Sequence, residues 1–255
     1  MGTGLRSSNH HPHQAIYYFK RRGPSRERDD TKPMISIIIP LYNQQEFIAD
    51  AIQSALDQTV PCEIIVINDG STDNSLEIAK GFEKHGVKVV SHPNKGLPSA
   101  RNTGIMNATG DYILPLDGDD ILQDNCVERL QFFIDQTGAD IVAPSFKCFG
   151  INSSDVILMP NPTLNDFKTA NRIPYCSAIK KEALLEVGGY SPRMLWGYED
   201  FHLWVTLLNR GKTLVTIPDK LFLYRVKEVS MITESLKHHD ELISQIVRDN
   251  PNVYA

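Results

Sequence analysis

The stretch ISIIIPLYN at residues 35–43 decides the fold class, together with EIIVINDGS at residues 63–71. Each contains a short run of mainly β-branched apolar residues and then turns polar, which is typical of a buried strand followed by a loop. Residues 87–90 and 112–114 predict two more strands, and apolar residues at helical spacing predict helices over 44–56, 74–82 and 97–107. This alternation predicts an α/β fold with a mostly parallel sheet, helices on both faces, and ligands at the carboxyl ends of the strands.

The pattern is less regular in the second half of the chain. Pro115 directly follows the fourth predicted strand, and since proline lacks an N–H, either the strand ends there or that side of it faces no partner. Strands are predicted at 140–145 and 213–217, and a helix at 196–209. Between them, residues 146–173 are rich in Asn, Pro and Ser and predict a long loop region, which is often functional.

Composition excludes several classes of protein. The 255 residues are 41% hydrophobic and 22% charged with a net charge of −5, which argues against a dedicated nucleic-acid binder. The sequence has neither a long apolar run nor a secretory leader, so we expect no transmembrane segment. The four cysteines lie far apart, which argues against a disulfide framework or a zinc ribbon and favours the cytoplasm.

The charge is unevenly distributed along the chain. Residues 1–33 hold seven Lys or Arg and three acids, a net charge of +4, with no sustained apolar period. They predict a flexible basic N-terminal extension. Its segment YYFKRR, residues 17–22, leaves open a peripheral contact with a membrane surface or a partner.

Polar residues follow the predicted strands, and the most acidic group is Asp117-Gly118-Asp119-Asp120. Three neighbouring carboxylates repel one another unless a cation joins them, and Mg²⁺ or Mn²⁺ binds one or two carboxylates together with substrate phosphates. The alternative interpretation is a solvated acidic turn in which Asp120 caps a helix. By similar reasoning Tyr42 can stack on a base and Arg101 can meet a diphosphate, although a core tyrosine and a surface arginine are equally open.

Seven segments, taken in order, resemble the family 2 inverting glycosyltransferases of GT-A fold. They are spread across residues 34–230. They read SIIIPLYN (36–43), INDGSTD (67–73), ARNTG (100–104), LDGDD (116–120), GGY (188–190), GYED (197–200) and LYR (223–225). The resemblance implies a single GT-A domain, with a Rossmann-like central sheet that is mostly parallel and flanked by helices.

The resemblance also implies a donor site. Pro40, Tyr42 and Asp69 would line the nucleoside region, with Asn94 beside them, and Arg101 would meet the diphosphate. The implied donor is a nucleotide diphospho-sugar, with a UDP-sugar favoured.

The metal site and the base follow from the same resemblance. Asp117 and Asp119 match the two acids of a DxD motif that binds Mn²⁺ or Mg²⁺ against the donor, and Asp119 is preferred as the direct ligand. Asp200 is preferred to Glu199 as the catalytic base, and because carboxylates are ionised at neutral pH, no large pKa shift is needed. Some members place a metal-binding histidine where this sequence has Lys227, so that ligand is doubtful, and phosphate contact by Lys227 or Arg225 is the alternative.

The sequence therefore predicts a metal-dependent enzyme that moves a sugar to an acceptor hydroxyl with inversion. The acceptor would be a glycan or a lipid-linked sugar in cell-surface polysaccharide or glycoconjugate synthesis, either free in the cytoplasm or at the inner face of the membrane. Residues 34–145 would bind the donor, residues 146–230 would supply acceptor contacts and the base, and residues 231–255 would form a C-terminal helical tail. The alternatives are a non-catalytic partner that binds nucleotide sugars and a metal-dependent nucleotidyltransferase.

Overall fold

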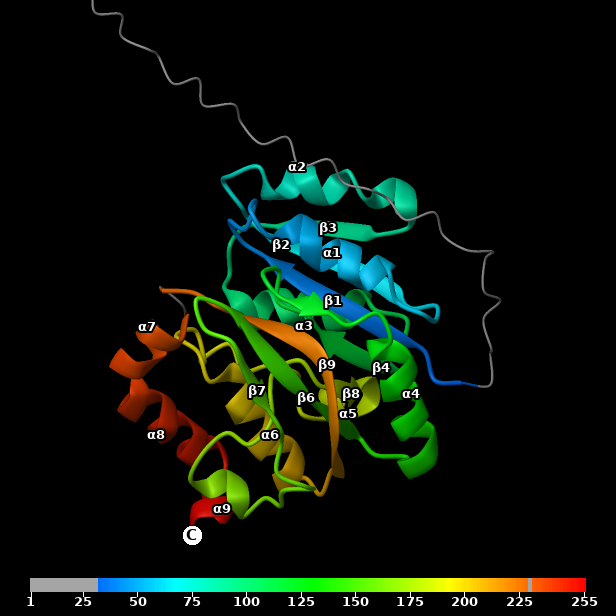
Figure 1. Ribbon diagram of the computed structural model, residues 1–255. Coiled ribbons are helices and arrows are strands. Elements are labelled where there is room, and N and C mark those ends of the chain that lie inside the picture. The colour runs from blue at the N-terminus through cyan, green and yellow to red at the C-terminus, as the bar shows by residue number, and fades with distance from the viewer. Residues whose placement is uncertain (1–31, 229–230) are drawn as a thin grey trace, which may run out of the picture.

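The computed structural model describes residues 32–228 and 231–255. Within these residues nine strands form one sheet, in the order β3-β2-β1-β4-β8-β6-β9-β5, and β7 pairs with β6 outside this path (Figure 1). The predicted N-terminal extension, residues 1–33, lies outside the described residues except for its last two.

The first four strands form the parallel sheet that the sequence predicts. They are β1 (Ile35–Leu41), β2 (Glu63–Asp69), β3 (Lys88–His92) and β4 (Tyr112–Pro115). Parallel pairing joins β3 to β2, β2 to β1 and β1 to β4. The connections carry the helices α1 (Ile48–Leu56), α2 (Ser75–Lys80) and α3 (Leu97–Asn107), with a short 3₁₀ turn η1 (Glu83–His85). Every residue of β1 is buried, Ser36 included, as its mainly apolar sequence predicts.

The rest of the sheet is mixed. Its strands are β5 (Ile121–Leu122), β6 (Ile141–Gly150), β7 (Ser154–Val156), β8 (Ala178–Lys180) and β9 (Leu214–Val226). β8 runs antiparallel to β4 and β6, whereas β6 and β9 are parallel. The predicted loop over residues 146–173 is wrong at its start, because β6 continues to Gly150 alongside β9 and turns back through β7.

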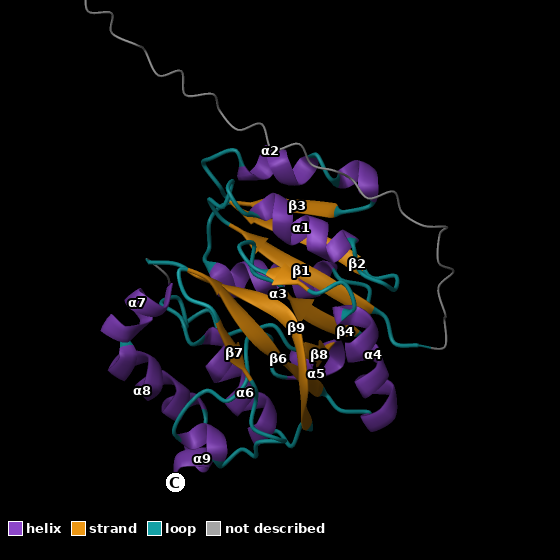
Figure 2. Ribbon diagram, viewed as in Figure 1, coloured by secondary structure: helices purple, strands orange, loops and turns teal. Residues whose placement is uncertain are grey.

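The helices of this half are α4 (Cys126–Thr137), α5 (Lys181–Glu186), α6 (Glu199–Asn209), α7 (Met231–Lys237), α8 (His239–Asp249) and α9 (Pro251–Tyr254), with a 3₁₀ turn η2 (Asp166–Lys168) (Figure 2). α6 begins three residues later than the predicted helix. None of the described helices combines the length and the apolar character needed to cross a bilayer.

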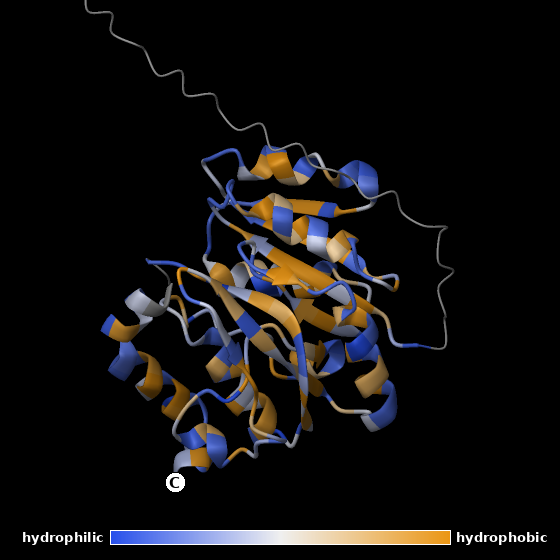
Figure 3. Ribbon diagram, in the orientation of Figure 1, coloured by the Kyte–Doolittle hydropathy of each residue, from blue (hydrophilic) through white to orange (hydrophobic). Residues whose placement is uncertain are grey.

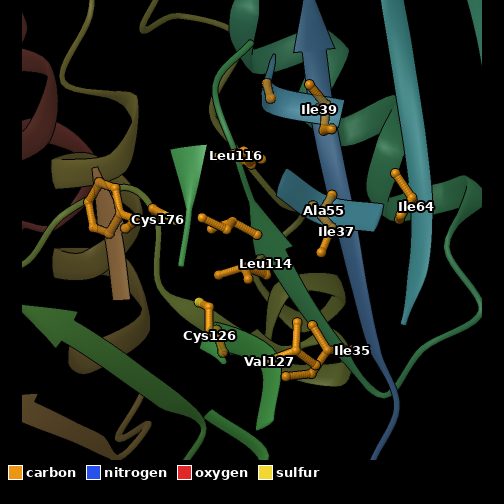
Figure 4. Packing of buried hydrophobic residues seen from close by; sticks show 14 of the residues in the cluster. Ile35, Ile37, Ile39, Ala55, Ile64, Leu114, Leu116, Cys126, Val127 and Cys176 are labelled. Carbon is orange, nitrogen blue, oxygen red and sulfur yellow. The ribbon is translucent and has the colours of Figure 1, made fainter. Parts of the chain in front are cut away.

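Two hydrophobic cores cover the two faces of the sheet. Alternate residues of β1 supply both, since side chains along a strand point to opposite faces. One core packs Ile35, Ile37 and Ile39 against α1 and α4, and Figure 4 shows these side chains converging with Leu114 and Val127. The other joins α3, α5, α6 and α8 on the opposite face. In Figure 3 the central strands are accordingly hydrophobic along most of their length.

Two prolines, Pro115 and Pro40, lie where the pairing between β1 and β4 ends, next to the site. The N–H groups of Tyr112 and Leu116 donate to the carbonyls of Met34 and Ile38, on the side of β1, so the nitrogen of Pro115 faces β8, whose pairing with β4 has already stopped at Ile113. Both alternatives predicted for Pro115 therefore hold: β4 ends there, and its nitrogen faces no partner. The nitrogen of Pro40 points to the side of β1 on which β4 has already ended, because the last β1–β4 pair is Ile38 with Pro115. The missing donors of both prolines cost the sheet no hydrogen bond.

Candidate active site

The carboxyl ends of β1, β2 and β4 bring three predicted site segments to one edge of the sheet. Tyr42 follows β1, Asp69 ends β2, and Asp117 follows β4 by two residues. These strands are parallel neighbours in register, so their carboxyl ends meet at the same edge. In an open α/β sheet this is the edge at which ligands bind.

Asp69 is buried and holds a neighbouring loop. Its two carboxylate oxygens accept hydrogen bonds from the backbone N–H groups of Lys95 at 2.7 Å and Gly96 at 2.9 Å. His92 Nδ1 lies 3.2 Å from the same carboxylate. The side chain predicted to contact a nucleobase is therefore occupied by the loop that leads into α3.

The exposed residues beside Asp69 are better placed to meet a ligand. Asn94 lies on the loop that Asp69 holds, and its backbone passes directly over Gly70, where a Cβ atom would come within 2.7 Å of the Asn94 nitrogen. Gly70 also has a φ of +71°, a conformation that favours glycine. Tyr42 is 47% exposed, whereas Pro40 is buried inside β1. Tyr42 and Asn94 are exposed and can contact a nucleoside directly. Pro40 and Asp69 are buried behind them, and Asp69 holds the loop that carries Asn94.

Each acid of the turn after β4 has its own partner. Asp120 is buried, accepts a hydrogen bond from the Tyr175 hydroxyl at 2.5 Å, and accepts another from the backbone N–H of Arg225 at 2.7 Å. Burial and the nearby charges of Asp117 and Asp119 raise its pKa well above the ordinary value. Asp119 forms an ion pair with Lys227 at 2.5 Å. The predicted helix-capping role of Asp120 is wrong, because both its oxygens are bound elsewhere and β5 follows it.

Arg101 lies inside the protein, between the two halves of the site. Its guanidinium donates to Asp117 Oδ1 at 2.7 Å and to Glu199 Oε1 at 2.5 Å, and its side chain is 1% exposed. The rings of Tyr175 and Tyr190 flank it, each with its centroid 5.2 Å away. The two carboxylates raise its pKa well above the ordinary value in spite of burial. We predicted that Arg101 meets a diphosphate, but here its charge is already balanced by two carboxylates, the buried Glu199 and the partly exposed Asp117.

The candidate base lies at the start of α6. Gly197 and Tyr198 have φ values of +120° and +57°, and this turn places Glu199 and Asp200 at the first two helical positions. Asp200 accepts hydrogen bonds from the backbone N–H of Phe201 at 2.7 Å and from Asn171 Nδ2 at 2.9 Å. Both donors are neutral, so its negative charge is not cancelled by an ion pair with either of them.

The surroundings of Asp200 change its acidity. Burial and the neighbouring charge of Glu199 raise its pKa to about 7, although Arg101 and the two hydrogen bonds act in the opposite direction. This differs from the expectation of an ordinary carboxylate pKa. A carboxylate with a pKa near 7 is a stronger base than an ordinary one and is matched to proton transfer at neutral pH.

The fit of a divalent cation is limited by these contacts. Among the described residues no cluster of three or more His, Cys, Asp or Glu side chains is arranged to hold a metal ion. Both oxygens of Asp120 are occupied, whereas Asp117 uses Oδ1 toward Arg101 and Asp119 uses Oδ2 toward Lys227, so the second oxygens of Asp117 and Asp119 are the ones that this turn can offer. One carboxylate completed by donor phosphates is still a site that Mg²⁺ or Mn²⁺ accepts.

Sequence reasoning missed two residues that shape the site. Asn171 lies in the segment predicted to be a functional loop, but nothing in the pattern singled it out from the other asparagines there. Tyr175 carries no local signal, because its role comes from contacts with Asp120 and with the backbone N–H of Asp117 at 3.1 Å.

Comparisons with known proteins identify the family. The sequence model of glycosyl transferase family 2 matches residues 36–195, more than half of the chain, so the protein belongs to this family. It is 30% identical over 222 residues to the glycosyltransferase GlyG of Streptococcus pneumoniae, covering 78% of this chain and 73% of GlyG. It is 28% identical over 217 residues to TuaG of Bacillus subtilis, a putative glycosyltransferase of teichuronic acid biosynthesis, covering 81% and 84% of the two chains. Similarity to EpsJ of Bacillus subtilis is higher, 44% over 117 residues, but covers 45% of this chain and about a third of EpsJ, 34%.

Solved structures show the same fold. TarS of S. aureus, solved with UDP-GlcNAc, superposes with a TM-score of 0.71 at 19% identity, over 84% of this chain and 66% of that one. A mannosyltransferase from Pyrobaculum calidifontis, solved with GDP-Man and Mn²⁺, gives 0.68 at 18% identity, over 88% and 68%. The predicted GT-A fold in a single α/β domain is therefore confirmed.

Proposed function

We propose that this glycosyltransferase moves one sugar from a nucleotide diphospho-sugar to an acceptor hydroxyl with inversion at the anomeric carbon. The observation that carries the proposal is the difference between two adjacent acids at the site. Glu199 is bound to Arg101, whereas Asp200 has only neutral hydrogen-bond donors and a pKa raised to about 7. This contrast supports Asp200 as the base and Glu199 as a residue that positions it.

The reaction needs one displacement. Asp200 takes the proton of the acceptor hydroxyl, the oxygen attacks the anomeric carbon, and the nucleoside diphosphate leaves from the opposite face with the bonding electron pair. A Mn²⁺ or Mg²⁺ ion, when bound, would neutralise charge on the departing diphosphate. Asp119 would hold that ion together with the donor phosphates, and Asp117, paired with Arg101, would fix the turn that carries Asp119.

We assign donor binding to residues 34–145, and acceptor contacts and the base to residues 146–230. The two parts meet at the acidic turn, since Asp119 and Asp120 belong to the first and their partners Lys227 and Arg225 to the second. Residues 231–255 remain assigned to a C-terminal helical tail.

The proposed donor is a UDP-sugar and the proposed acceptor a glycan or lipid-linked sugar. UDP-GlcNAc in the TarS structure supports the donor class, and the name of TuaG supports a role in cell-surface polysaccharide or glycoconjugate synthesis. The cytoplasmic setting, free or at the inner face of the membrane, stays a prediction from the sequence.

Product analysis tests the function. The protein is incubated with a panel of α-linked UDP- and GDP-sugars and Mn²⁺, with water as the acceptor, and the products are followed by NMR. We expect free nucleoside diphosphate and a sugar released first as the β-anomer. Pyrophosphate as the product would establish the nucleotidyltransferase instead. Binding without any turnover, with water or with glycan acceptors, would support the non-catalytic partner.

A variant of the base makes this test specific. Asp200→Asn should keep donor affinity and lower turnover at least ~10²-fold, the lower range for acid–base catalysis. The control is Asp155→Asn, which removes an exposed carboxylate on β7 and should leave turnover unchanged. Full turnover of the Asp200 variant would show that another group is the base.

A further inference from the structure

The ion pair between Lys227 and Asp119 occupies the position expected for a metal ion. Lys227 Nζ lies 2.5 Å from Asp119 Oδ2, with 33% of the lysine side chain and 15% of the aspartate side chain exposed. An ammonium at this distance makes the same kind of electrostatic contact with the carboxylate that a divalent cation would make. Since both are cations, an ammonium at Oδ2 repels a divalent cation from the same carboxylate.

Arg225, two residues earlier, is held much more firmly. Its guanidinium lies between the rings of Phe47 and Phe149, with its carbon 4.6 Å and 4.4 Å from their centroids. Its Nε donates to the backbone carbonyl of Asp119 at 2.7 Å. Arg225 is thus a fixed cation that shapes the acidic turn, and it would lose several contacts if it moved.

Lys227 has fewer constraints. Besides Asp119, its ammonium contacts the face of the Phe47 ring, at 5.5 Å from the centroid. Lysine carries its charge on a flexible four-carbon stem with rotatable donors, and partly exposed ion pairs are weak and easily exchanged. A diphosphate arriving beside Asp119 offers this ammonium a partner with more negative charge.

We propose that Lys227 and a divalent cation compete for the Asp119 carboxylate, so that the lysine keeps the donor-free protein from binding metal and turns to the diphosphate when the donor binds. The first step, competition for Asp119, concerns the donor-free protein. The second step, the contact of Lys227 with the diphosphate, rests on the proposed function. Lys227 would then be a second cation for the leaving group, next to the metal. In this exchange no covalent bond forms or breaks, and no proton is transferred.

Metal affinity tests the first step. Mn²⁺ binding is measured by electron paramagnetic resonance in the donor-free protein, for the wild type, Lys227→Met and Lys227→Arg. Removing the competing charge should tighten Mn²⁺ binding at least about tenfold in the Met variant, while the Arg variant should stay weak. Lys220→Met is the matched control, because Lys220 lies on β9, the strand that Lys227 directly follows, and pairs with Asp155; Lys220 is about 20 Å along the chain from Lys227. Its Mn²⁺ affinity should equal that of the wild type.

Nucleotide affinity tests the second step. UDP is titrated by calorimetry in excess EDTA, where the metal cannot contribute. Lys227→Met should bind UDP about tenfold more weakly than the wild type and Lys220→Met, since it lacks a charged donor to the phosphates. The proposal is overturned if Lys227→Met and the wild type have the same Mn²⁺ affinity, and also if Mn²⁺ binding is undetectable in both. It is likewise overturned if the two proteins bind UDP equally well in EDTA. Those results would leave transfer by the wild type intact, whereas failure of the proposed function would appear as absent turnover with every nucleotide sugar.

Discussion

At the scale of single residues, Glu199 and Asp200 differ in their surroundings more than in their chemistry. Both are carboxylic acids at the start of α6, where the helix dipole favours negative charge. The charge of Glu199 is balanced by Arg101, and the proximity of that negative group to Asp200 raises the pKa of Asp200. Arg101 therefore distinguishes Glu199 from Asp200, which the sequence alone leaves as alternative candidates for the base.

The raised pKa predicts a pH dependence. Because only the ionised form of Asp200 can accept a proton, kcat should be low well below pH 7, half-maximal near pH 7 and constant above about pH 8. Asn171→Ala removes a hydrogen bond that favours the carboxylate form, so it should move this limb to higher pH. The measurement is the pH profile of donor turnover at saturating donor. A limb at the ordinary carboxylate pKa of about 4 would contradict the assignment.

Arg101 defines a second prediction at this scale. Arg101→Gln leaves the buried carboxylate of Glu199 and the partly exposed carboxylate of Asp117 without their buried counter-charge, so the free energy of unfolding should fall by about 3–5 kcal/mol. Arg129→Gln is the control, because its ion pair with Asp219 is partly exposed and should contribute about 1 kcal/mol or less. Urea denaturation measures both. If the Arg101 variant keeps its stability and loses donor affinity, the guanidinium contacts the diphosphate, as the sequence predicted.

At the scale of elements, α3 connects the donor side of the site to the base. Arg101 reaches α6 through Glu199, and the next residue, Asn102, binds Tyr190 in the turn that follows α5. The Asn102 amide donates to the Tyr190 carbonyl and accepts from the Tyr190 N–H, both at 2.8 Å. Gly189 packs so tightly against Asn102 Oδ1 that a Cβ atom there would collide with it.

Two adjacent glycines test this connection. Gly189 and Gly188 have similar φ values, +75° and +78°, but a Cβ atom on Gly188 meets nothing within 4 Å. Gly188→Ala should cost about 1–2 kcal/mol of stability from backbone conformation alone. Gly189→Ala should cost more and should also lower kcat, because displacing Asn102 disturbs Tyr190, whose ring flanks Arg101, the partner of Glu199. Equal stabilities and equal kcat values for the two variants would refute the connection.

At the scale of the whole molecule, the C-terminal helices complete the second core. Leu242 and Ile246 on α8 and Val253 on α9 are buried in the cluster that contains Trp204 of α6. The surface of α6 opposite the sheet is therefore covered by the end of the chain. Within residues 231–255 the chain forms α7, α8 and α9, and α8 packs against the helix that carries Asp200.

This packing predicts a stability effect far from the site. Ile246→Ala should lower the free energy of unfolding by about 2–5 kcal/mol, as large-to-small changes in a core do. Leu236→Ala on α7 is the control, since Leu236 is 63% exposed and its loss should change stability by about 0.5 kcal/mol or less. Thermal and urea unfolding compare the two. Equal effects would mean that α8 contributes no core to this domain.

The sequence by itself determined the parallel strands, the helices between them and the acids at the strand ends. These features follow from short-range patterns, because burial and helix geometry repeat over a few residues. The family motifs lie in the same short segments. The continuation of β6 to Gly150 was missed because it depends on pairing with β9, about 70 residues later in the chain.

Only the tertiary structure decided what each acid does. Arg101 and Glu199 are 98 residues apart, Asn171 and Asp200 are 29 apart, and Lys227 meets Asp119 across most of the domain. Which charge balances which carboxylate depends on distance and burial after folding, and no local pattern encodes either. For that reason the sequence gives the set of acids at this site, whereas the fold determines which is paired, which is buried and which remains as a base.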